Sequence, residues 1–483
     1  MTVQSTANDF RFQTPSALPI DASFDGGPIT SDGGALLLAE VERHTGILAR
    51  LAGCFTDHRD PDLTEHTVAQ LVAQRVYGIA LGYEDLNDHD RLRTDPLLAT
   101  LVGKDDPLGQ RRARPGDRGK PLAGKSTLNR LELTPADADR CARYKKIVAR
   151  PEDIERLFVD VFLDAHAAPP EEIVLDLDAT DDPLHGAQEG RFFHGYYDCY
   201  CYLPLYVFCG EHLLCAKLQT AEHGAAAGAL AELERVVGRV RRAWPHVRVL
   251  VRGDSDFATE DIMAWCEGAG VDYVFGLEPN SRLREAIGRE MMWAHVGWLQ
   301  TGVAWREWAD LQYQTRKSWT RPRRVVAKAE YLPGGPNPRF VVTSPKAEAR
   351  PARELYESAY CGRCDAENRI KEQKLDLASG RTSTSELRAN QLRLWLSAAA
   401  YLLVSGLRRL GLSGTPLARA QCGTLRQRLL KIGGWVRVTA RRVLVSLSEG
   451  FPLRALFARA CAALSCLPPW PGPATAAVPA GGS

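Results

Sequence analysis

The order of predicted elements between residues 170 and 275 limits the possible folds more than any other feature of this sequence. Three short β-type runs come first and fit a meander, at Ile173–Leu177, Tyr200–Cys209 and Leu213–Leu218. Helix and strand patterns then alternate, as helix, strand, helix and strand, at Ala225–Ala243, Val247–Val251, Thr259–Gly268 and Val271–Phe275. Successive strands followed by β-α-β alternation predict an α/β fold in which helices pack against a mixed sheet.

Two of these strands end in acidic residues. The first strand carries Asp176 and Asp178, which the two-residue period of a strand places on one face at its carboxyl end. Asp254 is the first carboxylate where the strand at Val247–Val251 runs out. A carboxylate in such a rigid, desolvated position is stabilised by a bound cation, although a single aspartate there more often caps a turn.

A third acidic position lies in a helix-forming stretch, residues 360–374. At about 100° per residue, one sector of about 60° on this helix gathers an aromatic residue, a carboxylate and two cations, with Lys371 at its margin. Periodicity alone favours an ordinary solvated face with i,i+4 pairs, Arg363 with Glu367 and Glu367 with Lys371.

The rest of the chain divides into segments that differ in composition and expected secondary structure. Residues 1–150 are mainly helical, and residues 281–350 form a β-rich insertion with five tryptophans at 293, 298, 305, 308 and 319. The insertion separates the two parts of the α/β core, 151–280 and 351–410, and basic helices follow at 411–466 before a flexible tail at 467–483.

The net charge of the 483 residues is only +2, which taken alone argues against a nucleic-acid partner. Its distribution is uneven, because acidic residues prevail over 1–100 and basic ones over 101–150 and 401–466. The N-terminus has neither a basic nor an apolar leader segment, so we expect a cytoplasmic protein. The longest nearly apolar run, Leu394–Leu407, is too short to span a bilayer and predicts a buried helix, with no membrane partner.

Two motifs suggest other chemistries, and their context argues against both. Gly119–Ser126 fits the phosphate-loop pattern GxxxxGK[ST], but the arginine-rich segment 111–118 before it cannot be the buried strand that such a loop must leave. Gly253-Asp254-Ser255 is compatible with a serine esterase, but no Asp-x-x-His context follows it. The cysteine spacings do not match a structural zinc site, so we expect reduced thiols.

Resemblance to a known family favours a cation-binding site over turn-capping aspartates and a solvated helix face. The signature Y-x2-R-x3-E-x6-K of bacterial insertion-sequence DDE transposases is matched without deviation by Tyr360, Arg363, Glu367 and Lys374. Asp178-Ala-Thr180 is similar to the first aspartate block of that group, and Arg252–Phe257 to the second, with Asp256 where the group has glycine. Residues 176–186 and 388–392 most resemble the insertion-sequence thirteen-eighty family.

The resemblance implies a ribonuclease-H-like core interrupted by a β-rich insertion, with helical N- and C-terminal regions, and residues 1–150 are expected to be the DNA-binding domain. It further implies that Asp178, Asp254 and Glu367 are catalytic and hold two Mg²⁺ ions, for which Mn²⁺ can substitute. Contacts with DNA phosphates would come from Tyr360, Arg363, Lys371 and Lys374.

The partners implied by the resemblance are double-stranded DNA, as terminal inverted repeats and as target, and a second copy of the chain in a homodimer on DNA. We expect cleavage of the element's ends and their joining to target DNA, in the bacterial cytoplasm at the nucleoid. A nuclease without strand transfer and a non-catalytic DNA-binding relative are the alternatives. An insertion tryptophan is a candidate to stack on a flipped base, although core packing is the better expectation for each one.

Overall fold

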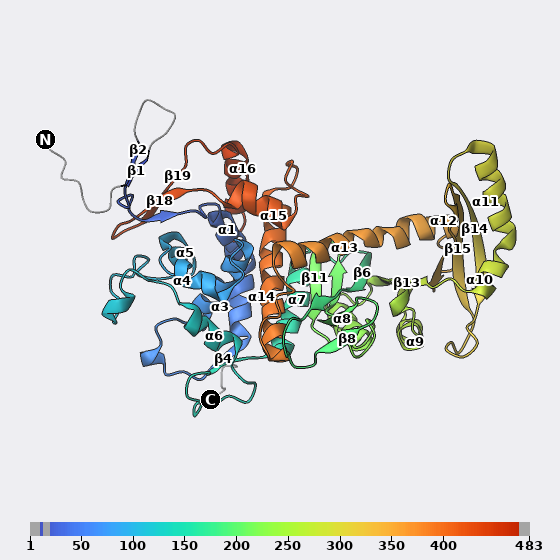
Figure 1. The fold of residues 1–483 in the computed structure, drawn as a ribbon, viewed down its shortest axis with the longest axis horizontal. Helices are drawn as coiled ribbons and strands as arrows, with labels where there is room; N and C mark the ends of the chain where they lie inside the picture. Colours follow the sequence, from blue (N-terminus) through green and yellow to red (C-terminus); the bar gives the residue numbers. More distant parts are fainter. Residues whose placement is uncertain (1–9, 13–19, 473–483) are drawn as a thin grey trace, which may run out of the picture.

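The computed structural model describes residues 10–12 and 20–472 of the chain. The molecule is elongated: the N-terminal helices and the C-terminal segments lie together at one end, a sheet occupies the middle, and the insertion forms the other end (Figure 1). Helix α14 (Leu387–Gly406) stands between the N-terminal helices and the sheet.

The central sheet has the strand order β11-β10-β6-β12-β13 followed by strands of the insertion. Strand β12 is parallel to both β6 and β13, whereas β10 is antiparallel to β6 and to β11. This arrangement is ribonuclease-H-like and confirms the predicted mixed sheet. Its five strands are β6 (Glu172–Ala179), β10 (Leu205–Cys209), β11 (His212–Lys217), β12 (Arg248–Gly253) and β13 (Asp272–Leu277).

The two faces of β6 have different neighbours. Leu175 and Leu177 belong to the hydrophobic cluster shared with helices α7 (Pro151–Asp164) and α8 (Ala229–Ala243). Val174, on the opposite face, packs with residues 355–360. Because side chains alternate along a strand, Asp176 and Asp178 share the face of Val174. The sequence pattern therefore directs both acids toward the helical segment that carries Glu367.

The predicted run Tyr200–Cys209 is two strands. Chain pairing breaks at Pro204, which has no backbone N–H to donate. A second, small antiparallel sheet is formed by residues that lie between the end of β6 and Pro204 in the sequence. Its members are β7 (Asp182–Pro183), β8 (Phe192–His194) and β9 (Cys199–Tyr202).

The insertion extends the central sheet. Strand β17 (Arg339–Thr343) pairs with β13 on one side and with β15 (Arg323–Leu332) on the other, and β14 (Trp305–Tyr313) forms the edge. The expectation of a β-rich segment missed two helices, α10 (Ser281–Ala286) and α11 (Gly288–Thr301). In α11 the side chains of Ala294 and Trp298 recur at helical spacing, and the helix covers β14 and β15.

The N-terminal region is mainly helical, as expected. One hydrophobic cluster joins its helices to α14, to strands β10 and β11, and to C-terminal residues as far as Leu464. Helix α14 is almost wholly buried, and none of the described helices is long and apolar enough to cross a membrane. The main N-terminal helices are α1 (Ala35–Thr45), α2 (Ile47–Gly53), α3 (Val68–Ala80), α5 (Pro96–Leu101) and α6 (Lys125–Glu132).

The C-terminal region differs from the expected run of basic helices. Residues 434–447 form a hairpin of β18 (Gly434–Val438) and β19 (Val443–Leu447), which pairs with β3 (Ile29–Thr30) before helix α16 (Arg454–Ser465). Val436 is buried while Trp435 is exposed, a two-residue alternation typical of a strand. Residues 467–472 also differ from the expected flexible tail, because the backbone N–H of Trp470 donates to the Arg43 carbonyl at 2.8 Å. Residues 473–483 lie outside the described part of the chain.

Candidate active site

Asp178 and Asp254 lie at the same edge of the sheet. Arg252 of β12 is in register with Asp176 of the parallel strand β6, so the positions two residues further along, Asp254 and Asp178, leave the sheet side by side. Asp254 follows the last residue of β12, and its side chain accepts a hydrogen bond from the backbone N–H of Asp256 at 2.9 Å. The carboxylate thus also caps the turn that begins there, which is the ordinary role of a strand-end aspartate.

Both carboxyls are perturbed by their surroundings. Burial raises the pKa of Asp178 to about 7; Arg363 opposes this shift, while Asp254 and Glu367 add to it. Burial also raises the pKa of Asp254, and the neighbouring carboxylates Asp256 and Glu367 act in the same direction. Asp178 and Asp254 are partly buried and, with Glu367, repel one another, so a cation bound among them would be strongly stabilised.

The segment that carries Glu367 is helical, as predicted, but it is not a regular α-helix. A π-helical turn (Leu355–Tyr360) and a 3₁₀ turn (Cys361–Arg363) precede α13 (Cys364–Lys371), and a second π-helical turn (Glu372–Asp376) follows it. These turns change the angular spacing of side chains, so the uniform 100° step used for the sequence face does not hold over its whole length.

Arg363 connects two of the three acids. Its guanidinium donates to Glu367 at 2.7 Å and lies 3.5 Å from the Asp178 carboxylate. The predicted i,i+4 pair between Arg363 and Glu367 is therefore present. Burial lowers the pKa of Arg363, but Asp178, Tyr360, Glu367 and Asp254 together outweigh that effect and the pKa is raised. The arginine occupies the position between the carboxylates as a positive charge.

Sequence reasoning did not identify the ion pair beneath this site. Arg252 donates to Asp176 at 2.5 and 2.7 Å, and its third nitrogen donates to the Ala359 carbonyl at 2.6 Å. It thereby ties β6 and β12 to the π-helical turn that precedes Arg363. Gly362 packs against the same side chain, since a Cβ there would lie 2.5 Å from the Arg252 guanidinium. The available signal was a charged residue inside an otherwise apolar strand.

The other residues of the signature occupy three different environments. Tyr360 lies over β13, where a Cβ at Gly276 would come within 2.8 Å of its hydroxyl. Lys371 is exposed on α13. Lys374 donates to the Thr180 hydroxyl at 3.1 Å and pairs with Asp181 at 3.1 Å, which joins the helical segment to the end of β6.

A cavity of about 890 Å³ opens beside Asp254. Its lining includes Asp256, Asp261 and Glu278 together with the aromatic rings of Tyr196 and Tyr197, and it contains no lysine or arginine. Phosphate groups are repelled by such a lining unless cations accompany them.

The donor set fits a hard divalent cation, because all three predicted ligands are carboxylates and two of them are partly buried, with raised pKa values. Among the described residues, no three acidic, histidine or cysteine side chains converge closely enough to enclose a metal ion. The ion pairs of Arg363 account for this arrangement, since they hold Glu367 on the guanidinium.

Comparison with known proteins supports the same chemistry. A family model described as Transposase DDE domain group 1 matches residues 12–469. The chain belongs to this family. Membership implies phosphoryl-transfer catalysis, and DDE transposases generally use divalent metal ions. A cryo-EM structure of a piggyBac transposase synaptic complex with hairpin DNA is also similar, with a TM-score of 0.39 and 10% identity over 83% of this chain and 80% of that one. No curated protein matches the sequence.

The insertion tryptophans of this DDE transposase differ in burial. Trp319 is buried against Tyr313, Trp308 is half-buried with its ring tilted against Tyr356, and Trp305 lies against Gly297 but is 39% exposed. Trp293 on α11 is 53% exposed, and Figure 1 places α11 at the end of the molecule opposite the N-terminal helices.

The two rejected motifs have structural roles. Lys125 of the phosphate-loop pattern begins helix α6 after a loop, and its backbone N–H donates to Asp90 at 3.0 Å. The Ser255 hydroxyl donates to Glu278 at 3.1 Å, and Ser255 itself lies in a short 3₁₀ turn.

Proposed function

We propose that the chain is an insertion-sequence transposase of the thirteen-eighty type, which binds the terminal inverted repeats of its element, cleaves the DNA ends and joins them to target DNA. The observation that carries this proposal is the placement of the three acids: Asp178 and Asp254 leave neighbouring parallel strands side by side, and Arg363 links Asp178 to Glu367 of the facing helix at 3.5 and 2.7 Å. Family membership supplies the phosphoryl-transfer class of the reaction.

Asp178, Asp254 and Glu367 would hold two Mg²⁺ ions, or Mn²⁺ in their place, through oxygen ligands alone. Bound there, the ions would lower the pKa of an attacking water or 3′-hydroxyl and stabilise the leaving oxygen. Asp254 is preferred over Asp256 as a ligand, because Asp256 is exposed whereas Asp254 directly influences Arg363 and lies beside Asp178.

The signature cations serve the DNA in this proposal. Arg363 is placed to exchange its carboxylate partners for a phosphate oxygen when cations neutralise the acids, and a guanidinium can contact a phosphate with two hydrogen bonds. Lys371 is exposed on the same helical segment, and Tyr360 flanks the strand ends. Lys374 contributes by holding the loop after Asp178 through Asp181, as well as by its charge. The partners are double-stranded DNA and a second copy of the chain, in a bacterial cytoplasm.

The test is a strand-transfer assay with labelled DNA ends taken from the flanks of the gene, with Mg²⁺ and a target plasmid. We expect Asp178→Asn, Asp254→Asn and Glu367→Gln each to abolish cleavage and joining while DNA binding remains. Asp256→Asn is the matched control, because it removes a neighbouring but exposed carboxylate. Normal cleavage by any of the three variants would remove that residue from the site.

The alternative is a metal-dependent nuclease that uses the same three carboxylates. Both enzymes would nick the DNA ends, and they differ in whether the free 3′-hydroxyl attacks a second duplex. Cleaved ends without joined products, under conditions in which the wild-type protein stays folded, would favour the nuclease.

A further inference from the structure

A groove of about 550 Å³ lies at the N-terminal region. Four residues of α6, together with Tyr144 and Lys145, line it, and residues 85–87 and Arg393 of α14 complete the lining. None of these residues belongs to the carboxylate site, and the sequence assigns the basic segment 101–150 only to the expected DNA-binding domain at 1–150, without placing a DNA contact in it.

Helix α6 is strongly amphipathic. Leu128, Leu131 and Glu132 are buried, whereas the face toward the groove carries only polar side chains. These side chains are Lys125, Ser126, Asn129 and Arg130. The helix therefore presents two cations, a hydroxyl and an amide together, in a pattern that core packing does not require.

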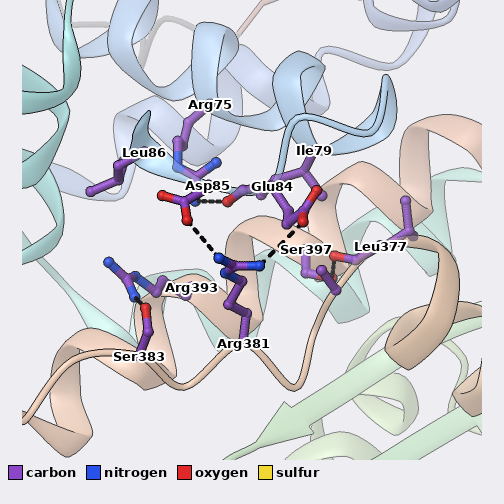
Figure 2. A pocket seen from close by; sticks show the side chains of 11 residues that line it. Arg75, Ile79, Glu84, Asp85, Leu86, Leu377, Arg381, Ser383, Arg393 and Ser397 are labelled. Atoms are coloured by element: carbon purple, nitrogen blue, oxygen red, sulfur yellow. Dashed lines mark hydrogen bonds and ion pairs between the residues drawn. The ribbon is translucent and has the colours of Figure 1, made fainter. Parts of the chain in front are cut away.

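Cations prevail at the groove. Arg130, which lines it, and Arg143, next to the lining residue Tyr144, lie over the Tyr144 ring at 5.1 and 4.9 Å from its centroid, and Tyr144 is 54% exposed. Within the described residues, neither these arginines nor Lys145 form an ion pair. The one carboxylate that lines the groove, Asp85, is neutralised by Arg381 at 2.5 Å, as Figure 2 shows.

The orientation of α6 is fixed by ion pairs on its buried side. Glu132, at the end of α6, is fully buried and pairs with Arg75 of α3 at 2.7 Å and with Arg393 of α14 at 2.6 Å. Figure 2 shows both arginines at the junction between the N-terminal helices and α14, where Arg393 also reaches Ser383. Arg75 and Arg393 share the one carboxylate of Glu132, and Arg381 at the same junction pairs with Glu84 and Asp85, so the charges of the junction balance. A ligand held by α6 is thereby held in a fixed relation to α14.

We propose that this groove binds the phosphate backbone of duplex DNA. The inference rests on the proposed function, which makes DNA the substrate. Arg130, Arg143 and Lys145 supply positive charge that no described carboxylate neutralises, and Ser126 and Asn129 supply hydrogen bonds between them. The cavity beside Asp254 has the opposite character, with acids and no cations. The duplex is thus bound at the α6 groove and cleaved at the separate carboxylate site.

The experiment measures equilibrium binding of the full-length protein to a fluorescent mixed-sequence duplex, in EDTA so that no cleavage occurs. The groove variant is Arg130→Gln/Lys145→Gln. The matched control is Arg242→Gln/Arg284→Gln, which removes two exposed arginines on α8 and α10 that form no ion pair with described residues. Thermal unfolding of each variant verifies its folding, and all four positions lie at the surface or the groove wall.

We expect the groove variant to bind about tenfold more weakly at about 0.1 M salt, and the slope of log K against log salt to fall by about 2, one for each lost phosphate contact. The control should keep the wild-type slope. Equal affinity and slope in the groove variant and the control would overturn the inference. A wild-type protein that binds DNA through the groove but cuts no DNA in Mg²⁺ would overturn the proposed function alone.

Discussion

Replacement of Arg252 by methionine tests whether the buried ion pair under the acids holds the site together. The substitution removes three hydrogen bonds, at 2.5 and 2.7 Å to Asp176 and at 2.6 Å to the Ala359 carbonyl. The two side chains are only 11% and 5% exposed, so Asp176 is left as a buried carboxylate without a counter-charge. Breaking such a pair by removing one partner costs ~3–5 kcal/mol, which is a large share of the ~5–15 kcal/mol free energy of unfolding of a typical folded protein.

The assay is urea unfolding of wild type, Arg252→Met, Asp176→Leu and the double variant. We expect Arg252→Met to lose ~3–5 kcal/mol and the double variant to recover much of it, because an apolar pair leaves no buried charge. Arg248→Met is the control, since Arg248 lies on the same strand with 67% exposure and pairs with Glu172 at 3.6 Å, a contact worth under ~1 kcal/mol.

The pH dependence sharpens this test. Burial raises the pKa of Asp176 and Arg252 lowers it, so removal of Arg252 should raise it further. Asp176 then becomes protonated in mildly acidic solution, where it needs no counter-charge, and the loss in Arg252→Met should shrink as the pH falls. A loss below ~1 kcal/mol at neutral pH, or additive effects in the double variant, would refute the reasoning.

Three further predictions concern single residues around the site. Asp182 is fully buried, and burial raises its pKa to about 7. The wild-type protein should therefore lose stability as the pH rises from about 4 to about 7, and urea unfolding above pH 7 should find Asp182→Asn up to ~4 kcal/mol more stable than wild type. Equal stability of the two proteins above pH 7 would contradict this prediction. Arg363→Gln frees Asp178 and Glu367, and calorimetry without DNA should show Mn²⁺ binding about tenfold tighter; weaker binding would mean that the guanidinium helps to assemble the ligands. Gly362→Ala crowds the Arg252 guanidinium and should cost ~1–3 kcal/mol in thermal unfolding, whereas an unchanged midpoint would show that Arg252 yields easily.

The central sheet was predictable because its strands bury both faces and its helices keep a regular period. Each predicted element from residue 173 to 275 is present with boundaries moved by a few residues, except that the run Tyr200–Cys209 is divided at Pro204 into β9 and β10. The hairpin of β18 and β19 was missed because strands of five residues have a weak period and one of them pairs with the distant β3. Helix α11 was missed although it has 14 residues, because the expectation of a β-rich segment was applied to the whole range 281–350.

The candidate ligands were also identifiable, because strand ends and a four-residue signature are local patterns. The contacts among them were not. The link from Arg252 to Ala359 spans 107 residues, and the π-helical turn at Leu355–Tyr360 has no simple sequence signal. Lys374 shows the limit of a motif most clearly, since the signature gives its spacing but not its pairing with Asp181.

The position of Arg363 implies an order of events. In the arrangement described here its guanidinium neutralises Glu367 and Asp178, and the acids beside Asp254 repel phosphate. A DNA phosphate that arrives together with divalent cations changes both interactions. The cations neutralise the carboxylates, and the guanidinium, released from them, binds a phosphate oxygen. Either partner alone leaves one charge unpaired at a partly buried site, which is unfavourable. Metal binding and DNA binding should therefore strengthen each other, and by linkage the DNA affinity should rise with Mn²⁺ by the same factor as the Mn²⁺ affinity rises with DNA.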